Sequence, residues 1–424
     1  MEVAYETTAV NPWRELGSMS VAKRNILIVT ELYPNADNPF IGTFVSSQIN
    51  ELRKYHRIVL IVPYLISFSR RASKHQPSHI QEKNVDIYYF KQYPFWILIP
   101  RIFKLLTSQA FSFLNKKYVS RKILRLAKKL HSTYHFSLVH GHESYIGDEA
   151  GVVGKKLGIP SIVTIHGLYD YHKLGFGERV MNIVVRNLNL ATRLFAVSKI
   201  AASSYQKNGV DREIDIIPNG LNEDSLKSIR PLPEKWKEVI QGKTVILTVG
   251  FFVKEKRFER VIEAARRLKD KYGESFVILM VGRGELEKTY RKLIQENRLE
   301  RHIYIVGQVH PSDMMSYYSA SDFLAHPSII ESFSMACLEA ASAGKPFICT
   351  SNIGFTEYLT PNKEAFVIPP DNIEALTEKM GALIGDKKLR EQMGGVAKQT
   401  AETFLWKNQI HKTLSIYDQL IQAE

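Results

Sequence analysis

The sequence predicts an α/β protein with two doubly wound domains, in which parallel strands alternate with helices. Three observations lead to this prediction. Short apolar runs typical of buried strands recur along the chain, and amphipathic helix patterns separate most of them. A turn at Pro218–Gly220, followed by a polar stretch, divides these runs into two series. The 424 residues suffice for two or three domains of roughly 150 residues each. We expect the two domains to face a central cleft that binds ligands.

The first series of strands lies before the turn. We expect residues 1–20, which lack the pattern of a signal peptide, to form a loosely ordered leader, and residues 21–218 to form an N-terminal domain. Such continuous apolar runs are typical of parallel sheets that helices cover on both faces. The expected strands are 25–30, 58–62, 85–90, 138–140, 161–165, 194–197 and 214–217, and helix patterns include 43–55 and 120–130.

The second series follows a polar, proline-containing segment, residues 219–242, which we interpret as a linker. We expect residues 243–402 to form a C-terminal domain and residues 403–424 to form a helix that packs back on the N-terminal domain. The expected strands are 244–249, 276–281, 303–306, 323–326, 346–349 and 365–368, and the expected helices are 257–270, 285–297, 335–343 and 371–384.

The composition excludes several classes of protein. Apolar residues make up 45% of the chain and charged residues 24%, which excludes a mainly disordered, collagen-like or coiled-coil protein. The two cysteines, Cys337 and Cys349, cannot form a disulfide framework, and a reducing cytosol suits them best. No Cys/His cluster has zinc-binding spacing, so we expect no metal site. No apolar run reaches the roughly 18 residues of a membrane span.

The net charge of +14 is unevenly distributed. Between Leu52 and His142 there are seventeen lysines and arginines against two acids, Glu82 and Asp86. A localised basic surface indicates an anionic partner, such as membrane headgroups, nucleic acid or a phosphorylated substrate.

One part of this basic segment, residues 93–113, is also apolar and aromatic. That composition suits a membrane interface, and the alternative is an insertion packed on the N-terminal domain. The aromatic residues are mixed with aliphatic ones, unlike a stacking platform, and no recognition motif is present, so we expect no nucleic-acid partner. The residues expected to contact the membrane are Phe95, Trp96, Arg101 and Lys104.

The most informative stretch for chemistry is 322–346. An expected strand runs into a loop that contains Glu331, and the helix that follows contains Glu339 and ends before Pro346. Carboxylates accept hydrogen bonds from the hydroxyls of sugars, and free amides at the start of a helix bind phosphate or sugar oxygens. Alternatively, Glu331 is a loop acid and Glu339 a solvated helix residue. The amides at the helix start are those of Ser332, Phe333, Ser334 and Met335.

This Glu-x7-Glu element before Ala-Gly-x-Pro resembles the signature of retaining nucleotide-sugar glycosyltransferases of family 4. Those enzymes have the GT-B fold, in which two Rossmann-like domains face a central cleft. The resemblance implies a metal-independent hexosyltransferase with no cofactor besides its nucleoside diphosphate sugar. Further segments that resemble the family, in the expected order, are Ile165–Gly167, Ile217–Gly220, Val249–Gly250 with Lys254–Lys256, Val281–Gly284, Gly307–Val309 and Ser351–Gly354 with Glu357.

The resemblance also implies roles for individual residues. His166 and Glu331 would act on the transferred sugar as catalytic residues. An ammonium group such as that of Lys256 can hold a diphosphate as a point charge. From the residues alone, the alternatives are that His166 is a buried structural histidine, Lys256 a solvated lysine and Gly42 a plain helix-start turn. The implied donor-binding residues are Gly42, Gly250, Lys256, Gln308, Val309, Ser332, Phe333, Ser334, Met335 and Glu339.

The sequence departs from the family at one loop. The family usually places an arginine directly after the glycine of the donor loop, where this chain has Phe251. Lys254 and Arg257 are the two candidates to replace the missing charge. No Asp-x-Asp triplet occurs, which argues against the glycosyltransferases that bind the donor diphosphate through a metal ion.

The resemblance implies transfer of a sugar to a glycan or lipid-linked acceptor. With the basic segment, it places the enzyme in the cytoplasm, peripherally on the anionic inner face of the plasma membrane. Two alternatives remain: a nucleotide-sugar epimerase of the same fold, and a non-catalytic basic protein that binds nucleic acid or membranes.

Overall fold

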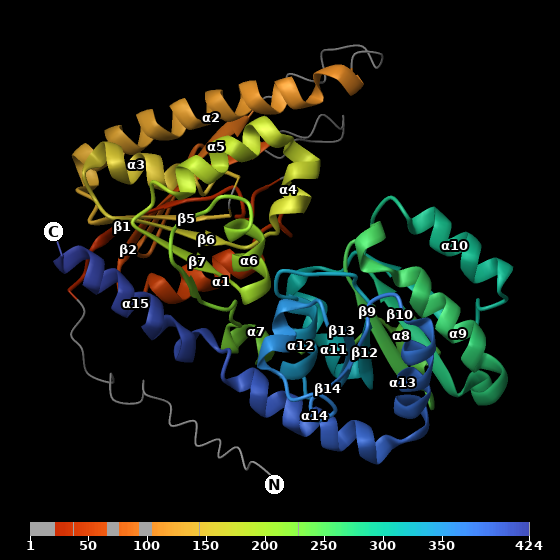
Figure 1. Ribbon diagram of the computed structural model, residues 1–424. Helices are drawn as coiled ribbons and strands as arrows, with labels where there is room; N and C mark the ends of the chain where they lie inside the picture. Colours follow the sequence, from red (N-terminus) through yellow and green to blue (C-terminus); the bar gives the residue numbers. More distant parts are fainter. Residues whose placement is uncertain are drawn as a thin grey trace, which may run out of the picture.

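The computed structural model describes residues 22–36, 38–65, 76–92, 104–143, 145–227 and 229–423. They form two domains, each with a twisted sheet covered by helices on both faces (Figure 1). The N-terminal domain contains the first sheet and the C-terminal domain the second, so the α/β class and the two-domain arrangement predicted from the sequence are confirmed.

The first sheet has eight strands in the order β3-β4-β2-β1-β5-β6-β7-β8. Every pairing is parallel except that of β3 with β4, which is antiparallel. The sequence analysis missed β3, because this exposed edge strand reads His-Ile-Gln-Glu and has no apolar run. The strands are β1 (Asn25–Val29), β2 (Arg57–Leu65), β3 (His79–Glu82), β4 (Val85–Gln92), β5 (Leu138–His142), β6 (Ser161–Ile165), β7 (Arg193–Ala196) and β8 (Ile214–Ile216).

Helices cover both faces of this sheet. The helix expected over 43–55 ends at Leu52, and the pattern over 120–130 is the middle of a 31-residue helix, α2. The buried ammonium of Lys116 anchors α2 by ion pairs to Asp148 at 2.5 Å and Glu149 at 2.8 Å. The helices are α1 (Thr43–Leu52), α2 (Lys104–Tyr134), α3 (Glu149–Leu157), α4 (Tyr169–Phe176), α5 (Glu178–Leu188) and α6 (Lys199–Gln206).

The second sheet has six parallel strands in the order β11-β10-β9-β12-β13-β14. The direction in which successive strands are added to the sheet reverses between β9 and β12, as it does between β1 and β5 in the first sheet. Ligands of such sheets bind beyond the carboxyl ends of the strands at this switch point. The strands are β9 (Thr244–Val249), β10 (Phe276–Val281), β11 (Ile303–Gly307), β12 (Phe323–His326), β13 (Phe347–Thr350) and β14 (Ala365–Ile368).

The helices of the second sheet include two that the sequence analysis did not anticipate, α11 and α14. The expected helix over 285–297 covers 287–296, and that over 371–384 covers 373–385. The helices are α9 (Phe258–Tyr272), α10 (Glu287–Glu296), α11 (Met314–Ala320), α12 (Met335–Ser342), α13 (Ile373–Gly385) and α14 (Lys387–Glu402), with short 3₁₀ helices η3 (Lys254–Lys256), η4 (Gly273–Ser275), η5 (Pro311–Asp313) and η6 (Gly354–Tyr358).

Two chain crossings connect the domains. The segment interpreted as a linker contains two short helices, α7 (Glu223–Lys227) and α8 (Glu234–Ile240). The chain returns after α14, and its last helix, α15 (Trp406–Gln422), packs on α1 against the first sheet. The crossings pair with each other through Leu221, whose amide donates to Phe404 O at 3.0 Å and whose carbonyl accepts from the Trp406 amide at 2.9 Å.

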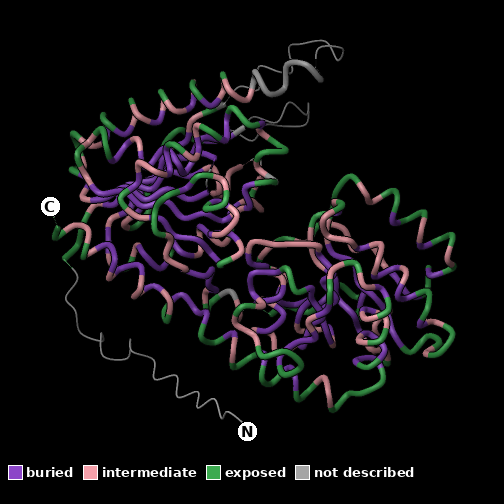
Figure 2. The backbone as a smooth tube through the Cα atoms, viewed as in Figure 1, coloured by how far each residue is buried: buried purple, intermediate pink, exposed green. Residues whose placement is uncertain are grey.

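The buried residues follow the two sheets (Figure 2). One apolar cluster includes Leu27 of β1 and Leu247 of β9, so apolar packing continues from one domain into the other. A second cluster lies between the second sheet and α9, and a third joins the first sheet to α1 and α15. In the part of the chain that the structure describes, no helix is long and apolar enough to cross a lipid bilayer.

Candidate functional site

Glu331 lies at the switch point of the second sheet, in the loop after β12. Its carboxylate accepts hydrogen bonds from Lys256 Nζ at 2.6 Å and Ser328 Oγ at 2.7 Å, and it also contacts His326 Nε2. Burial alone would raise the pKa of Glu331, but the charges of His326 and Lys256 outweigh it and hold that pKa well below its usual value. Glu331 is therefore ionised at neutral pH.

His326 is a site residue that the sequence analysis missed. It is the last residue of β12 and fully buried, and its Nε2 also lies 3.2 Å from the hydroxyls of Ser328 and Ser334. Burial opposes protonation of His326, but the Glu331 carboxylate outweighs burial and raises the pKa of the ring. His326 thus fixes the orientation of Glu331. Its place at the end of a strand beside the candidate loop was the signal available in the sequence.

Lys256 reaches Glu331 from the loop after β9, on the other side of the switch point. The ion pair is largely shielded, with 21% of the lysine side chain and 15% of the glutamate side chain exposed. Gly250, which has φ 152°, lies beside the lysine: a Cβ there would be in ordinary contact with Lys256 Cε, at 3.4 Å. The structure therefore brings together the predicted residues Gly250, Lys256 and Glu331.

The start of α12 offers backbone donors next to Glu331. In the described part of the chain, the amides of Ser332, Phe333, Ser334 and Met335 donate no hydrogen bond within the protein. Ser334 has φ 91°, a conformation that residues other than glycine rarely adopt, and its Oγ accepts a long hydrogen bond from the Cys337 amide. Free amides at a helix start are suited to bind an anion.

Glu339 lies in the second turn of the same helix. Burial raises the pKa of Glu339 to about 7, and the hydroxyl of the neighbouring Tyr318 lowers it only in part. Tyr318 Oη is buried and does not reach full hydrogen-bonding geometry with any group. The carboxyl group of Glu339 is therefore close to half protonated at neutral pH and retains capacity to accept hydrogen bonds from a ligand.

Gln308 and Val309 follow β11, the edge strand two places from β9. Since neighbouring strands lie about 4.8 Å apart, this loop is about 10 Å from the loop after β9, along the same edge of the sheet. The Gln308 side chain is exposed, whereas Val309 packs on the core. These positions suit contact with a part of the ligand remote from Lys256.

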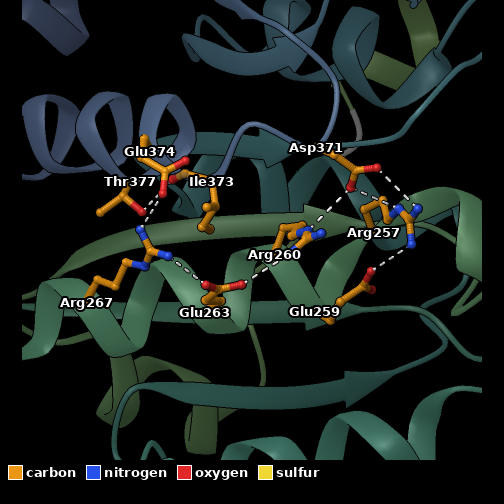
Figure 3. A network of polar contacts seen from close by, with 9 residues as sticks. All are labelled: Arg257, Glu259, Arg260, Glu263, Arg267, Asp371, Ile373, Glu374 and Thr377. Atoms are coloured by element: carbon orange, nitrogen blue, oxygen red, sulfur yellow. Dashed lines mark hydrogen bonds and ion pairs between the residues drawn. The ribbon is translucent and has the colours of Figure 1, made fainter.

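Lys254 and Arg257 are the two candidates to replace the arginine that the family has at the position of Phe251, and their surroundings differ. Figure 3 shows Arg257 in a surface network of ion pairs, with its guanidinium 3.1 Å from Asp371 and 3.4 Å from Glu259. Lys254 is exposed and has no ion pair among the described residues. Phe251, where the family has arginine, is 60% exposed. Arg257 is thus already paired with carboxylates, and Lys254 is the available cation.

His166 lies in the opposite domain, one residue beyond β6. Its Nε2 is 3.1 Å from Nδ1 of His142, and its ring packs on Phe44 with centroids 4.9 Å apart. Burial lowers the pKa of His166 well below its usual value and that of His142 to about 3, so both rings are neutral at pH 7. The Nδ1 of His166 is buried and makes no hydrogen bond of full geometry, although the side chain of Asn219 lies close enough to act on the ring.

Gly42 immediately precedes α1, the helix that carries Phe44 onto His166. It adopts the left-handed conformation, with φ 62°, and a Cβ there would lie 2.1 Å from the carbonyl oxygen of Leu32. Glycine is therefore required for close packing of the helix start on the loop after β1.

The substitution Gly42→Ala should destabilise the protein strongly. Left-handed strain costs about 1–2 kcal/mol, and the overlap with Leu32 adds about 1–3 kcal/mol. Gly158→Ala is the matched control, because Gly158 has φ 71° but no atom within 4 Å of the added Cβ. Urea unfolding should show a clearly larger loss for Gly42→Ala. Equal losses would contradict the steric role of Gly42.

The switch point of the first sheet carries a pair of acids that the sequence analysis missed. Val29 of β1 is in register with Gly141 of β5, so Glu31 and Glu143 each lie two residues beyond that pair. Glu143 has φ 73°, and burial together with the charge of Glu143 raises the pKa of Glu31 well above its usual value. His172 Nε2 lies 3.3 Å from the Glu143 carboxylate. Only the register of the two strands reveals this pair.

The two halves of the candidate site lie in different domains, and these domains contact each other beside Glu331. Among the described residues, no hydrogen bond or ring contact joins His166 to Glu331, but Ser198 Oγ, in the loop after the neighbouring strand β7, donates to Ser332 O in the loop of Glu331. Among the described residues, no group of three or more His, Cys, Asp or Glu could hold a metal ion. The predicted membrane residues Phe95, Trp96 and Arg101 lie outside the described residues, and Lys104 is the first residue of α2.

Comparison with known proteins identifies the family. Residues 41–225 match the model of Glycosyltransferase Family 4, and residues 233–400 match that of Glycosyl transferases group 1. One relative is the Bacillus subtilis protein TuaC, whose name describes it as a glycosyltransferase of teichuronic acid biosynthesis. The two sequences are 24% identical over 380 residues, which cover 83% of this chain and 87% of TuaC.

Solved structures share the fold. Sucrose-phosphate synthase from Thermosynechococcus elongatus aligns with a TM-score of 0.72 at 18% identity, over 95% of this chain and all of that one. HepE of Anabaena, solved in complex with UDP, aligns with a TM-score of 0.68 at 16% identity, over 92% of this chain and 99% of that one. The chain therefore has the GT-B fold and belongs to the group 1/family 4 glycosyltransferases.

Proposed function

We propose that this glycosyltransferase moves a hexosyl group from a nucleoside diphosphate sugar to a glycan or lipid-linked acceptor, with retention of configuration and without a metal ion. The observation that carries the proposal is the cluster of Lys256, Glu331 and the free amides of 332–335 at the switch point of the second sheet. It combines donors for an anion with an ionised acceptor for sugar hydroxyls.

In this proposal, the ammonium of Lys256 and the amides at the start of α12 stabilise the negative charge that develops on the departing diphosphate. Glu331 accepts hydrogen bonds from the sugar, and Glu339 accepts them from the ribose. The neutral ring of His166, whose Nδ1 makes no hydrogen bond of full geometry, hydrogen-bonds a sugar hydroxyl from the opposite domain. Gln308 and Val309 contact the nucleobase.

Proton transfer follows from the electrostatics of these groups. The depressed pKa values of His166 and Glu331 make both of them weak bases at neutral pH. A departing diphosphate oxygen is then the better acceptor for the proton of the attacking hydroxyl. The bond from the anomeric carbon to the diphosphate breaks while the bond to the acceptor oxygen forms on the same face, which retains the configuration.

The first donors to test are UDP-sugars, because HepE was solved with UDP. The purified protein is incubated with a panel of nucleoside diphosphate sugars, lipid and glycan acceptors, and EDTA, and mass spectrometry follows the products. Transfer of a hexose, with the anomeric configuration of the donor by NMR, supports the proposal. An epimerised donor without transfer, or transfer with inversion, would overturn it.

Donor binding should depend on the ionisation of Glu339. Its pKa is about 7 because of burial, and ribose hydroxyls that donate to the carboxylate favour its ionised form. Below pH 7, binding therefore releases a proton from Glu339. As the pH decreases in this range, UDP affinity should fall by up to about tenfold per pH unit. Calorimetric titration of UDP across this range measures the effect.

Glu339→Gln is the control for this measurement, because it removes the titrating group and retains the shape. UDP itself titrates near these pH values, and the variant isolates that contribution. The pH dependence should be weaker in Glu339→Gln than in the wild type. Identical pH dependence in both would show that Glu339 does not contact the nucleotide.

We further propose that the N-terminal domain docks on an anionic membrane at the cytoplasmic face, where a lipid-linked acceptor would reach the cleft. The supporting observation is the outer face of α2, a helix without a single acid. Its exposed basic residues have no ion pair among the described residues, and each contributes about 1 kcal/mol near an anionic surface. They are Lys117, Arg121, Arg125, Lys128 and Lys129.

Co-sedimentation with vesicles tests the docking. The wild type should bind vesicles that contain anionic lipid, and salt should weaken the binding. Combined replacement of Arg121, Arg125 and Lys128 by glutamine should reduce binding, whereas the same replacement of Arg266, Lys288 and Lys388, exposed residues of the C-terminal domain, should not. Equal binding to neutral and anionic vesicles would refute the proposal.

A further inference from the structure

The helix α6 of the N-terminal domain begins against a carboxylate of the C-terminal domain. Glu357, in η6, accepts a hydrogen bond from the Lys199 amide at 3.0 Å with one oxygen and from the Ile200 amide at 3.1 Å with the other. These amides have no partner within a helix, and the helix dipole favours a negative charge at this end. An acid from one domain thus caps a helix of the other.

A second contact lies beside this cap. Ser198 accepts a hydrogen bond from the Ala201 amide at 3.1 Å and donates to the carbonyl of Ser332, the residue after Glu331. The surfaces fit closely, because a Cβ on Gly354 would lie 2.1 Å from Ser332 O and 2.6 Å from Ser198 Cβ. The start of α6 is therefore held by both the 331–334 loop and η6.

In the C-terminal domain, Glu357 and Glu331 belong to one rigid unit. The Glu331 amide donates to Asn352 O at 3.1 Å, and the Glu331 carbonyl accepts from the Gly354 amide at 3.1 Å. The Phe355 amide donates to Phe333 O at 2.8 Å. The backbone that leads to Glu357 is thus hydrogen-bonded along the loop that carries the site.

In the N-terminal domain, the start of α6 and His166 belong to neighbouring strand ends. Ile165 of β6 is in register with Ala196 of β7, so His166 lies one residue and Ser198 two residues beyond that pair. A shift of α6 relative to Glu357 would therefore move His166 relative to Glu331. The paired chain crossings at Leu221 and Leu405 leave such a shift possible as a hinge rotation.

We propose that Glu357 is a positioning residue, which latches α6 to the C-terminal domain and thereby sets the placement of His166 opposite Glu331. Its effect on transfer rests on the proposed function, whereas its effect on the domain arrangement does not. The side chain is exposed, so water can replace the contact and its loss leaves the fold intact.

Spin labels on the full chain test the domain arrangement. Lys156→Cys on α3 and Lys292→Cys on α10 place one label on each domain at exposed positions, and the native cysteines, Cys337 and Cys349, are buried. The distance distribution between the labels is then measured by double electron–electron resonance. Glu357→Ala and Glu357→Gln should broaden or shift it.

The matched control is Glu374→Gln, which removes an exposed carboxylate that pairs with Arg267 inside the C-terminal domain. It should leave the distance distribution and the transfer rate unchanged. Glu357→Asp, which keeps the charge on a shorter side chain, should restore part of the wild-type distribution.

Kinetics and nucleotide binding separate positioning from stability. Glu357→Ala should lower kcat by about tenfold, the equivalent of one charge-assisted hydrogen bond, while UDP affinity stays within about twofold of the wild type. The groups of the C-terminal domain that are proposed to bind UDP stay in place in this variant, and its thermal unfolding midpoint should barely change.

A wild-type distance distribution in both Glu357→Ala and Glu357→Gln would overturn the proposal that Glu357 latches α6 to the C-terminal domain. If the wild type transfers no sugar from any donor, the proposed function fails, and the distance distributions alone decide the role of Glu357.

Discussion

Glu331→Gln is expected to lower the rate of sugar transfer by about 100-fold or more, while UDP affinity changes by less than about tenfold. The carboxylate of Glu331 is ionised and held by Lys256, Ser328 and His326. It can therefore accept hydrogen bonds from the transferred sugar without reorganising. An uncharged amide stabilises the positive charge that develops on the sugar far less, and in the proposed arrangement Glu331 contacts the sugar and not the nucleoside diphosphate.

His166→Ala should act in the same direction, because it removes the ring nitrogen that we propose to contact the sugar from the opposite domain. Glu364→Gln provides the matched control: Glu364 is also a buried acid of the C-terminal domain, but it binds Thr360 and Thr400 instead of the site. Initial rates and UDP titrations of the three variants are compared. Normal turnover in both Glu331→Gln and His166→Ala would show that the cleft assignment is wrong.

Lys256→Ala is expected to lower transfer by about 100- to 1,000-fold in buffer that contains EDTA, since it removes the cation that we propose to stabilise the departing diphosphate. The loss in UDP affinity should be smaller, about tenfold, because charge on the diphosphate increases as the bond to the sugar breaks. The variant also leaves Glu331 without its ammonium partner, so part of the loss reflects a misplaced carboxylate.

Two comparisons sharpen this prediction. Lys288→Ala, which alters an exposed lysine of α10, should leave transfer unchanged. Lys254→Ala measures whether that lysine supplies the charge expected at Phe251, because Arg257 is paired with Asp371. The prediction fails if EDTA abolishes wild-type transfer and magnesium restores it.

The strands were predictable because most of them are buried on both faces and read as continuous apolar runs. The elements that were missed lack that signal. The edge strand β3 is exposed and shows little alternation of apolar and polar residues. The helices α7 and α8 are short and polar, and α14 has a weak apolar face. The bounds of α1 and α2 also differed from the expected ones, and α2 begins well before residue 120, in a part of the helix that the buried Lys116 anchors to Asp148.

The site was predictable where it follows the chain. Glu331 and Glu339 lie in one strand–loop–helix element, and Lys256 lies in the loop that faces it. The partners that were missed depend on contacts between distant segments. Glu31 meets Glu143 through the register of β1 and β5, and Glu357 caps α6 only because the two domains pack together.

Arg257 shows the same limit from the other direction. The sequence presents it as a free cation beside Lys256, but its guanidinium is paired with Asp371, a residue 114 positions further along the chain (Figure 3). Charge in a sequence indicates what a residue can bind, whereas packing decides whether that charge is still available.

The most direct test of the central claim is calorimetric titration of UDP into the wild type and Glu339→Ala, with EDTA in both cells. The claim is that the switch point of the second sheet binds a nucleoside diphosphate through protein groups alone, without a metal ion. We expect the wild type to bind UDP, and Glu339→Ala to bind it more weakly by about 1.5–3 kcal/mol, the contribution of a hydrogen bond to a charged group. Unchanged affinity in Glu339→Ala, or binding of UDP only when magnesium replaces EDTA, would contradict the account.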